Sequence, residues 1–593
     1  MTKRERRGVG RARTRASIAG LALLAAGGGW LAFATPGASA ANRARTALAL
    51  DAPTAATLPD WRFGFEYWEV FGPTVTPAQH AALLDKLAVV TATQPARGGI
   101  NVNEIGGGWS TMQPTPSSPY DFSQSDLAVQ TIGAKGFSTV WNLRPTAPWS
   151  MVGNPDCVDG PGNDECAPDA AHEQAWKDYV KAVVERYDGD GIDDMPGLAV
   201  PVQFYVMDQE IAFEGTEGTG DYAEALGYGF WDDSIPHLVR LHKLTYEAIH
   251  EADPTGFSKL VGSGGLIFDL YSDFPEYPNP NPGPGSVVSA RLDGANPKGA
   301  IFREGFDGLV ELMTALGDDS DGVKCDYIEW HPHNGWRAID QTLALITQYA
   351  PNKPIFIDDM WSNMFARNTP LPGWTMFIGG DQIEGDFPNA TVSDYSTLAD
   401  GLKNNNTTLV NWYNAKGARG AVKSFATALG AGAERVSFTG SNDPCAYQFL
   451  TSCLDQQLIF SWFGYSHLLG TKATNYAYKP VYWTFKLLVE KLQSMSAVTR
   501  LGVSANQLTR VYKFDRPSGG PVYVAWSEAG PVPADPAVPN GETVSVPVGS
   551  ASIKLTKIIT APGQTVPSTQ TLSAPGNQLT IQLGFEPIFF EEL

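Results

Sequence analysis

The sequence predicts an α/β protein with a (β/α)8 TIM barrel, followed by a C-terminal β-sandwich. Strand-like and helix-like segments alternate eight times between residues 61 and 494, and such alternation implies parallel strands joined by helical crossovers. Eight units favour a closed barrel over an open sheet. From about Val498 the pattern changes to short alternating strands, such as 522–526 and 578–582, separated by Gly and Pro turns. That second pattern is typical of a small β-sandwich.

The expected strands are short apolar runs, and several of them end in polar residues. They are 61–68, 98–103, 137–142, 200–207, 259–262, 327–333, 353–359 and 434–438. The expected helices carry apolar residues at helical spacing. They are 77–90, 123–135, 170–187, 235–252, 302–316, 338–349, 415–429 and 479–494. Pro77 favours the start of the first helix, and Ser123 is expected to cap the second.

Residues 1–40 are expected to be a signal peptide rather than part of the fold. Seven basic side chains precede an apolar stretch at 18–35, and Ala38-Ser39-Ala40 has the small residues of a cleavage site. A retained membrane anchor is the alternative, and Arg6-Arg7 leaves the twin-arginine route open. The expected location is therefore secreted or periplasmic.

The remaining chain is divided into a linker (41–58), the barrel (59–495) and the β-sandwich (496–593). No stretch after the signal peptide is long and apolar enough to span a bilayer, so no stable membrane insertion is expected. The sequence leaves the oligomeric state open.

The charge balance points to a neutral partner. The formal charge is −21, and loss of residues 1–40 would remove seven bases and one acid to give −27. A protein this acidic repels nucleic acid and anionic membranes.

The five cysteines agree with an oxidising compartment. Cys157 and Cys166 lie close together in one polar segment, and Cys445 and Cys453 in another, so two local disulfides are expected. Cys325 is expected to be a buried free thiol. The acids in the segment 146–169 show no spaced ligand set and are expected to be solvated. No metal or other cofactor is predicted.

The stretch 203–214 organises the chain, because an apolar run breaks there into Asp208, Gln209 and Glu210. A buried strand cannot carry three unpaired polar groups through its middle. The three residues must lie at the carboxyl end of the strand, where a barrel opens its ligand crevice. A plain hydrogen-bonded strand terminus is the alternative.

Polar and aromatic side chains crowd the ends of the other predicted strands. The polar ones at the predicted mouth are Glu66, Asn103, Asn142, Arg144, Gln209, Glu210, His331, His333, Asp358, Asp359 and Asn442. The aromatic ones are Trp68, Trp109, Trp149, Trp330, Trp336 and Trp361. Carboxylates, amides and imidazoles among indole rings are typical of a sugar site, although any single Trp can equally belong to the core.

Two acids on different strands can perform glycoside hydrolysis across such a mouth. One protonates the glycosidic oxygen, and the other attacks the anomeric carbon or activates water. His331 and His333 share a face of their strand and offer a metal pair instead. No third ligand of matching spacing accompanies them.

The barrel segment resembles the retaining (β/α)8 glycoside hydrolases of clan A, both cellulase-like and β-xylosidase/α-L-iduronidase-like. In that clan strand four ends in Asn-Glu, which Gln209-Glu210 matches with Gln in place of Asn. Strand six often carries His-x-Tyr, matched by His331-Pro332-His333. Strand seven usually reads Pro-Ile-x-Ile-Thr-Glu, matched by Pro354-Ile-Phe-Ile-Asp-Asp359.

The resemblance implies a general acid/base at Glu210 and a nucleophile at Asp359. It extends over about residues 61–593 and includes the helix around 423–429, strand eight and the C-terminal β-domain. Asp is one methylene shorter than Glu, which withdraws its carboxylate by about 1.5 Å. Asp358 is the rival nucleophile. Because neighbours in a strand point to opposite faces, only one of the two is expected in the mouth, and the motif favours Asp359.

The sequence therefore predicts a secreted glycoside hydrolase that acts on a plant or microbial glycan or glycoside, by a retaining double displacement. The remaining rim residues are expected to bind substrate or orient the acids; they are Gln209, Asn142, Arg144, Asn103, Glu66, His331, His333, Asp358, Trp361 and Trp149. A carbohydrate-binding barrel without catalysis, and a transglycosidase or lyase that uses the same pocket, are the alternatives. The sugar, the linkage and the choice between exo and endo action are left open.

Overall fold

The computed structural model describes most of the barrel and of the C-terminal sheets. The described residues are 61–66, 76–94, 97–102, 108–145, 147–155, 157, 166–207, 231, 233–264, 308, 310–332, 336–360, 406–440, 468–469, 477–506, 508–529 and 539–593. All of them belong to one compact unit, Ala52–Leu593. The expected signal peptide (1–40) and linker (41–58) lie outside the described residues.

Eight parallel strands close into a barrel in chain order. They are β1 (Phe63–Glu66), β2 (Gly99–Val102), β3 (Ser138–Leu143), β4 (Phe204–Met207), β5 (Lys259–Gly262), β6 (Tyr327–Glu329), β7 (Ile355–Met360) and β8 (Ala433–Phe438). β8 returns to pair with β1, with Val436 beside Phe63. The predicted TIM barrel is confirmed.

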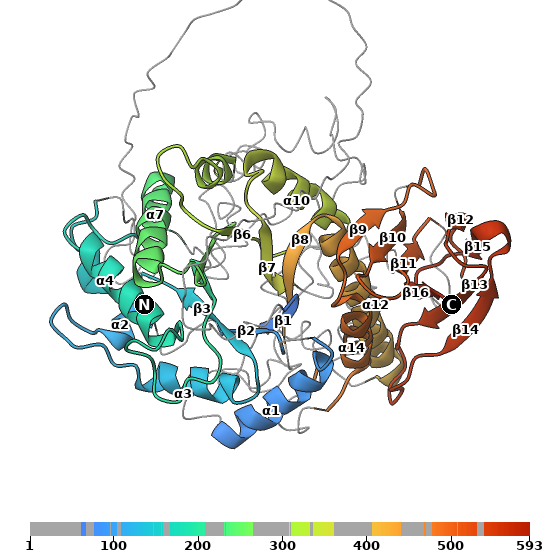
Figure 1. The fold of residues 1–593 in the computed structure, drawn as a ribbon, viewed down its shortest axis with the longest axis horizontal. Helices are drawn as coiled ribbons and strands as arrows, with labels where there is room; N and C mark the ends of the chain where they lie inside the picture. Colours follow the sequence, from blue (N-terminus) through green and yellow to red (C-terminus); the bar gives the residue numbers. More distant parts are fainter. Residues whose placement is uncertain are drawn as a thin grey trace, which may run out of the picture. The chain divides into compact units, whose positions relative to one another are not determined.

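Helices follow the strands and surround the barrel (Figure 1). They are α1 (Pro77–Val90), α2 (Gly108–Met112), α3 (Ser123–Gly133), α4 (Glu173–Tyr187), α7 (Ile235–Ala252), α10 (Trp336–Tyr349), α12 (Thr407–Gly430) and α14 (Pro480–Leu492), with a 3₁₀ turn η1 (Pro148–Ser150). The expected helix at 302–316 lies only partly within the described residues, and those from 310 onward are helical.

Local signals explain where most of these helices begin. Thr76 and Gln79 form a capping box at the start of α1, with Pro77 in the first turn. The expected Ser123 cap of α3 is wrong. Ser123 is the first helical residue, Phe122 occupies the cap, and the Asp121 carboxylate accepts a hydrogen bond from the Ser123 backbone N–H at 2.9 Å. An acid two residues upstream thus takes the role that Ser123 was expected to have.

Strand alternation divides the apolar side chains into an inner and an outer set. Inside the barrel, Phe204, Phe356 and Trp61 pack edge to face or tilted, with Trp61 to Phe356 at 5.8 Å. The outer set, which includes Phe65 and Ile357, packs against the helices. Because the inner set is apolar at this level, the polar inward positions lie further along the strands.

Two antiparallel sheets follow the barrel. One has the order β14-β13-β16-β11-β10-β9 and the other pairs β12 with β15. Their strands are β9 (Ala497–Arg500), β10 (Thr509–Asp515), β11 (Val522–Ser527), β12 (Thr543–Pro547), β13 (Ser552–Lys557), β14 (Thr569–Ser573), β15 (Gln578–Gln582) and β16 (Ile588–Glu592), with a 3₁₀ turn η4 (Pro575–Asn577). Trp526 and Phe589 of the larger sheet belong to the same apolar core as the barrel helices.

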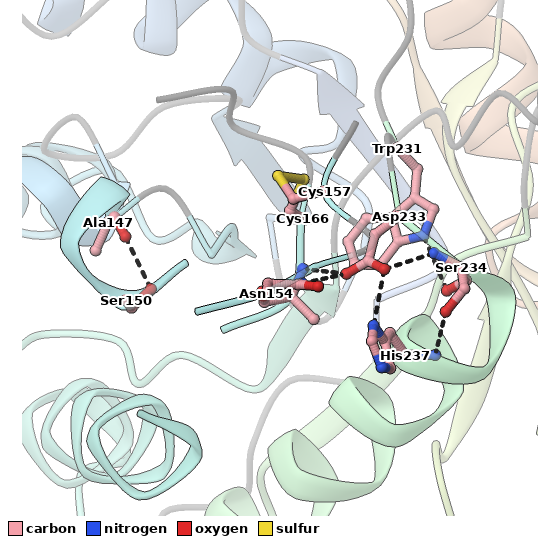
Figure 2. The surroundings of a disulfide bond; sticks show 10 residues. Ala147, Ser150, Asn154, Cys157, Cys166, Trp231, Asp233, Ser234 and His237 are labelled. Carbon is pink, nitrogen blue, oxygen red and sulfur yellow. Dashed lines mark hydrogen bonds and ion pairs between the residues drawn. A yellow bond between two sulfur atoms is a disulfide. The ribbon is translucent and has the colours of Figure 1, made fainter. Parts of the chain in front are cut away.

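A disulfide closes the segment that precedes α4, and a buried acid joins this segment to the one that precedes α7. Cys157 and Cys166 are joined, as the sequence predicts. Beside the disulfide, Asp233 accepts hydrogen bonds from the Asn154 side chain at 2.7 Å and from the Ala167 backbone N–H at 3.1 Å (Figure 2). His237 contacts the same carboxylate through Nδ1 at 2.8 Å.

Cys325 is a buried free thiol, as predicted. Burial raises the pKa of this thiol to about 12. The second predicted pair, Cys445 and Cys453, lies outside the described residues. Within the described parts of the chain, no helix has the length and apolar character needed to cross a membrane.

Candidate active site

Polar side chains replace apolar ones at the inward positions near the carboxyl ends of β6 and β7. Phe356 points into the barrel, so Asp358 two residues later lies on the same face. Glu329 and His331 have the same spacing at the end of β6. All three are almost completely buried. The strands thus bring two carboxyl groups and an imidazole together at the carboxyl end of the barrel.

His331 is the centre of this group. Its Nε2 lies 2.8 Å from Asp358 Oδ1 and also pairs with Glu329 Oε1. On the other side, Asn101 at β2 donates an amide hydrogen bond to Asp358 Oδ2 at 2.8 Å. Asp358 therefore uses both oxygens to hold neighbours from two strands. Its position is that of an internal anchor.

Asp359 also reaches this group, which corrects the expectation that only one of the two aspartates would. The pairing of β7 with β8 shifts register between Ile357 and Met360. Such an irregularity breaks strict alternation and re-aims side chains. The Asp359 carboxylate pairs with His331 Nδ1 at 3.5 Å and accepts a hydrogen bond from the Thr439 hydroxyl, just after β8. Asp359 is 4% exposed, whereas Asp358 is 0% exposed.

Burial and crowded charges shift the pKa values of two members. Burial and the negative charge of Asp358 raise the pKa of Glu329 well above its usual range. For His331, burial alone would lower the pKa, but the charges of Glu329, Asp358 and Asp359 outweigh it and raise the pKa well above the ordinary value. Both groups therefore keep their protons to higher pH than the same side chains do in water.

Asn142 offers an unused amide at the same end of the barrel. It follows Val140, an inward residue of β3, by two positions. Its side chain is 6% exposed. Among the residues that the structure describes, neither its amide nitrogen nor its carbonyl oxygen has a hydrogen-bond partner. A buried amide with both atoms available suits a ligand that donates and accepts hydrogen bonds.

The remaining described candidates have different settings. Glu66 is buried at the carboxyl end of β1, and Arg144 is half-buried just after β3. Trp149 packs edge to face against Trp109 at 4.9 Å, and its indole N–H donates to the Gln113 carbonyl at 3.1 Å. Its predicted role in substrate binding stays a prediction.

Three of the tryptophans expected at the aromatic rim belong to the core instead. Trp109, Trp330 and Trp336 are at most 1% exposed. Trp336 packs on Trp526 of the larger C-terminal sheet at 5.1 Å. A fully buried indole has no free face for a sugar ring, so these three are not stacking platforms.

Several predicted site residues lie outside the described residues. They are Asn103, Gln209, Glu210, His333 and Trp361. The catalytic role of Glu210 and the binding roles of the other four therefore stay predictions.

The sequence interpretation missed Glu329, Asn101 and Thr439 as site residues. Glu329 stands two positions before His331, so strand alternation was the signal that puts both on one face. Asn101 directly follows the apolar Ile100 in β2, so strand alternation puts these two side chains on opposite faces of the strand. Thr439 carries no such signal, because its contact with Asp359 depends on the register between β7 and β8.

The group also has the residue types of a metal centre. Ligand atoms of Glu329, His331 and Asp358 all lie within 4.8 Å of one another. Metal ligands must give up their protons. His331 Nε2 is already engaged by two carboxyl groups, and the pKa of His331 is raised. The residues therefore fit a shared-proton cluster better than a metal site.

Comparisons with known proteins give structural likenesses only. No protein-family model matches the chain, and no curated protein is similar to it. A family 39 glycoside hydrolase from Bacteroides cellulosilyticus aligns with a TM-score of 0.48 at 10% identity, covering 90% of this chain and 81% of that one. A monomeric β-xylosidase from Caulobacter crescentus aligns with a TM-score of 0.46 at 13% identity, covering 91% and 98%. A glucosidase from Croceicoccus marinus aligns with a TM-score of 0.45 at 10% identity, covering 90% and 96%.

Proposed function

We propose that the protein is a glycoside hydrolase with Asp359 as its nucleophile. The observation that carries the proposal is the setting of Asp359 at the carboxyl end of β7. The Thr439 hydroxyl and the His331 imidazole, whose pKa is raised, hold its carboxylate. Active sites of TIM barrels lie at this end. Retaining glycosidases need a carboxylate that is fixed in place and kept ionised.

In the proposed reaction, the Asp359 carboxylate attacks the anomeric carbon and the bond to the leaving group breaks. Glu210, assigned from the sequence alone, gives its proton to the departing oxygen. Water then attacks the glycosyl ester, Glu210 takes a proton from that water, and Asp359 leaves as a carboxylate. The positive charge of His331 stabilises the negative charge of Asp359 before the first step and after the second. Asn142 is proposed to bind a substrate hydroxyl.

The short side chain of Asp359 is compatible with this role. The register shift between Ile357 and Met360 includes Asp359. In the proposed reaction the Asp359 carboxylate must reach the anomeric carbon as the longer glutamate of the clan A motif does. A local displacement of the strand supplies reach that the side chain lacks. Asp358, by contrast, is engaged by Asn101 and His331 on both of its oxygens.

The finer assignments belong to the same proposal. The enzyme is proposed to be secreted or periplasmic, with residues 1–40 as its signal peptide, and to act on a plant or microbial glycan. The two C-terminal antiparallel sheets are proposed to form a β-sandwich. A carbohydrate-binding barrel without catalysis is the second candidate, favoured by the replacement of Glu with Asp at position 359.

The decisive experiment screens the purified mature protein against nitrophenyl glycosides and polysaccharides. On a turned-over substrate, Asp359→Ala should lose nearly all activity. Added azide or formate should restore part of it by entering the space of the missing carboxylate. The azide product should have the configuration opposite to that of the substrate, because one displacement replaces two.

Asp358→Asn is the matched control. It should keep turnover in the folded fraction and mainly reduce stability, because Asp358 anchors Asn101 and His331. Loss of activity in Asp358→Asn together with activity in Asp359→Ala would exchange the two roles. Binding of a glycan without turnover of any substrate would favour the non-catalytic barrel.

A further inference from the structure

The turn that connects α4 to β4 is unusually acidic. It follows Tyr187 and contains Asp188, Asp190, Asp193 and Asp194, interrupted by two glycines. In a barrel, turns from helix to strand lie at the face opposite to the active site, where residues contribute to stability. The glycoside hydrolase proposal does not involve this turn.

Three carboxylates converge at this turn. One oxygen each from Glu185, Asp188 and Asp190 lies within 4.8 Å of the other two. Glu185 is half-buried in the last turn of α4, Asp188 follows the helix and Asp190 is exposed. Such spacing allows one cation to contact all three.

Asp188 is buried, and only one of its two carboxylate oxygens has a hydrogen-bond partner among the described residues. Its side chain is only 6% exposed. One oxygen, Oδ1, accepts a hydrogen bond from the Asp190 backbone N–H at 3.2 Å. The other, Oδ2, is buried, and within the described residues it has no hydrogen-bond partner. A buried carboxylate oxygen without a partner is costly unless a ligand satisfies it.

Backbone hydrogen bonds fix the shape of the turn. Asp194 accepts from the backbone N–H groups of Gly189 at 3.0 Å and Gly191 at 2.8 Å. Asp190 Oδ1 accepts a hydrogen bond from the Ile192 backbone N–H at 2.7 Å. Gly189 and Gly191 have φ values of 77° and 93°, which favour glycine. The turn is therefore organised before any ligand binds.

The ion pairs of the described residues leave these acids unbalanced. Within the described part of the chain, no Lys, Arg or His forms an ion pair with Glu185, Asp188 or Asp190. The carboxylates of Asp194 and Asp253 add further negative charge around Asp188. The turn thus has a negative potential that a cation would relieve.

We propose that Glu185, Asp188 and Asp190 bind a Ca²⁺ ion at this turn. All three side-chain donors are carboxylate oxygens, which hard cations prefer. Ca²⁺ takes 6–8 oxygen ligands in flexible geometry, and backbone carbonyls of the turn and water can complete that number, whereas Mg²⁺ demands near-ideal octahedral geometry. The bound ion would tie the end of α4 to the segment that leads into β4.

The test uses the full chain after treatment with EDTA and dialysis, with Ca²⁺ alone as the probe. Titration calorimetry should show saturable binding of one Ca²⁺ ion per chain, with a higher affinity than for Mg²⁺. Addition of Ca²⁺ should also raise the Tm. Terbium, used in place of Ca²⁺, should give luminescence sensitised by nearby tyrosine. Asp188→Asn and Asp190→Asn should each weaken Ca²⁺ binding by about tenfold or more, since each removes one charged ligand.

Asp193→Asn is the matched control, because it removes one charge from the same turn without removing a proposed ligand. Asp193 has a φ of 52°, a conformation that Asn also tolerates. This variant should keep the binding and the Tm shift. If Asp188→Asn fails to fold, the exposed Asp190→Asn decides the result.

Three results would overturn the proposal: no saturable binding by the unmodified chain, undiminished binding in Asp190→Asn, or an equal loss in Asp193→Asn. None of these readouts uses catalysis. The calcium site and the proposed hydrolase activity can therefore fail separately.

Discussion

Glu329 and His331 show how single residues in a barrel mouth share protons. Both are buried, both lie on the inward face of the β6 end, and both have raised pKa values. Glu329 and Asp358 both contact His331 Nε2, and His331 Nδ1 in turn pairs with Asp359.

The raised pKa values predict a pH dependence of stability. A group whose folded pKa is raised stabilises the protein below its unfolded pKa, and this contribution is lost as the pH rises through the folded pKa. For Glu329 the loss begins above about pH 4.3, and for His331 above about pH 6.5. The free energy of unfolding should therefore fall with rising pH.

Glu329→Gln isolates the part that comes from Glu329. A glutamine copies the hydrogen bonds of the protonated acid but cannot ionise, so the variant should gain stability relative to the parent as the pH rises from 5 to 8. The gain should reach at most about 1.4 kcal/mol per pH unit, the value for one proton. Denaturant unfolding at several pH values measures it. Burial also raises the pKa of Asp188, but this adds the same pH dependence of stability to the parent and to the variant. A stability difference between the two proteins that stays constant or falls with rising pH would contradict the assignment.

At the scale of elements, the short disulfide segment organises the approach to two helices. The bridge closes a segment with a sequence separation of 9. Asp233, just before α7, accepts hydrogen bonds from Asn154 and from the backbone N–H of Ala167, on either side of that segment (Figure 2). The cross-link therefore restrains the groups that fix the entry to α7.

Removal of the bridge should destabilise the protein. In the chain-entropy description, a loop of this length gives about 2–3 kcal/mol. The double variant Cys157→Ser with Cys166→Ser should lose that amount of unfolding free energy in urea titrations. The parent in reductant should lose at least that amount, because reductant also opens the predicted Cys445–Cys453 bridge. Cys325→Ala is the control, because its buried thiol takes no part in the bridge. An unchanged midpoint in the double variant would mean that Asp233 and its partners hold the segment without the disulfide.

At the scale of the whole molecule, a buried ion pair joins the barrel to the larger C-terminal sheet. Lys423 of α12 lies 2.6 Å from Glu528, just after β11, with side chains 1% and 0% exposed. Trp336 of α10 donates to the same carboxylate at 3.2 Å. A second connection runs from Arg510 of β10 to Asp340 of α10 at 3.0 Å. Together with the shared apolar core, these contacts couple the unfolding of the two parts.

Lys423→Met should therefore cost about 3–5 kcal/mol, because it leaves the Glu528 charge buried without its partner. The double variant Lys423→Met with Glu528→Gln should recover most of that loss. Urea unfolding followed by tryptophan fluorescence and by far-UV circular dichroism should show one coincident transition in the parent. Two separated transitions in the parent, or an unchanged free energy of unfolding in Lys423→Met, would show that the barrel and the sheets are energetically independent.

Local chemistry in the sequence determined much of the fold. The bounds of α1, α7, β5 and β15 agree with those expected, because proline at helix starts, helical spacing and short apolar runs are signals read within one segment. The eightfold alternation of strands and helices was sufficient to predict the closed barrel. The sequence also predicted the Cys157–Cys166 pair and the buried thiol of Cys325.

Tertiary structure decided what depends on residues far apart in the chain. The register shift of β7 against β8 brings both Asp358 and Asp359 to His331, which alternation within one strand excludes. Trp336 became core because a sheet almost two hundred residues later covers it. Strand register and the packing of distant segments are set by the sum of many contacts. A local pattern therefore identifies which residues carry the chemistry, while the packed barrel decides which of them meet.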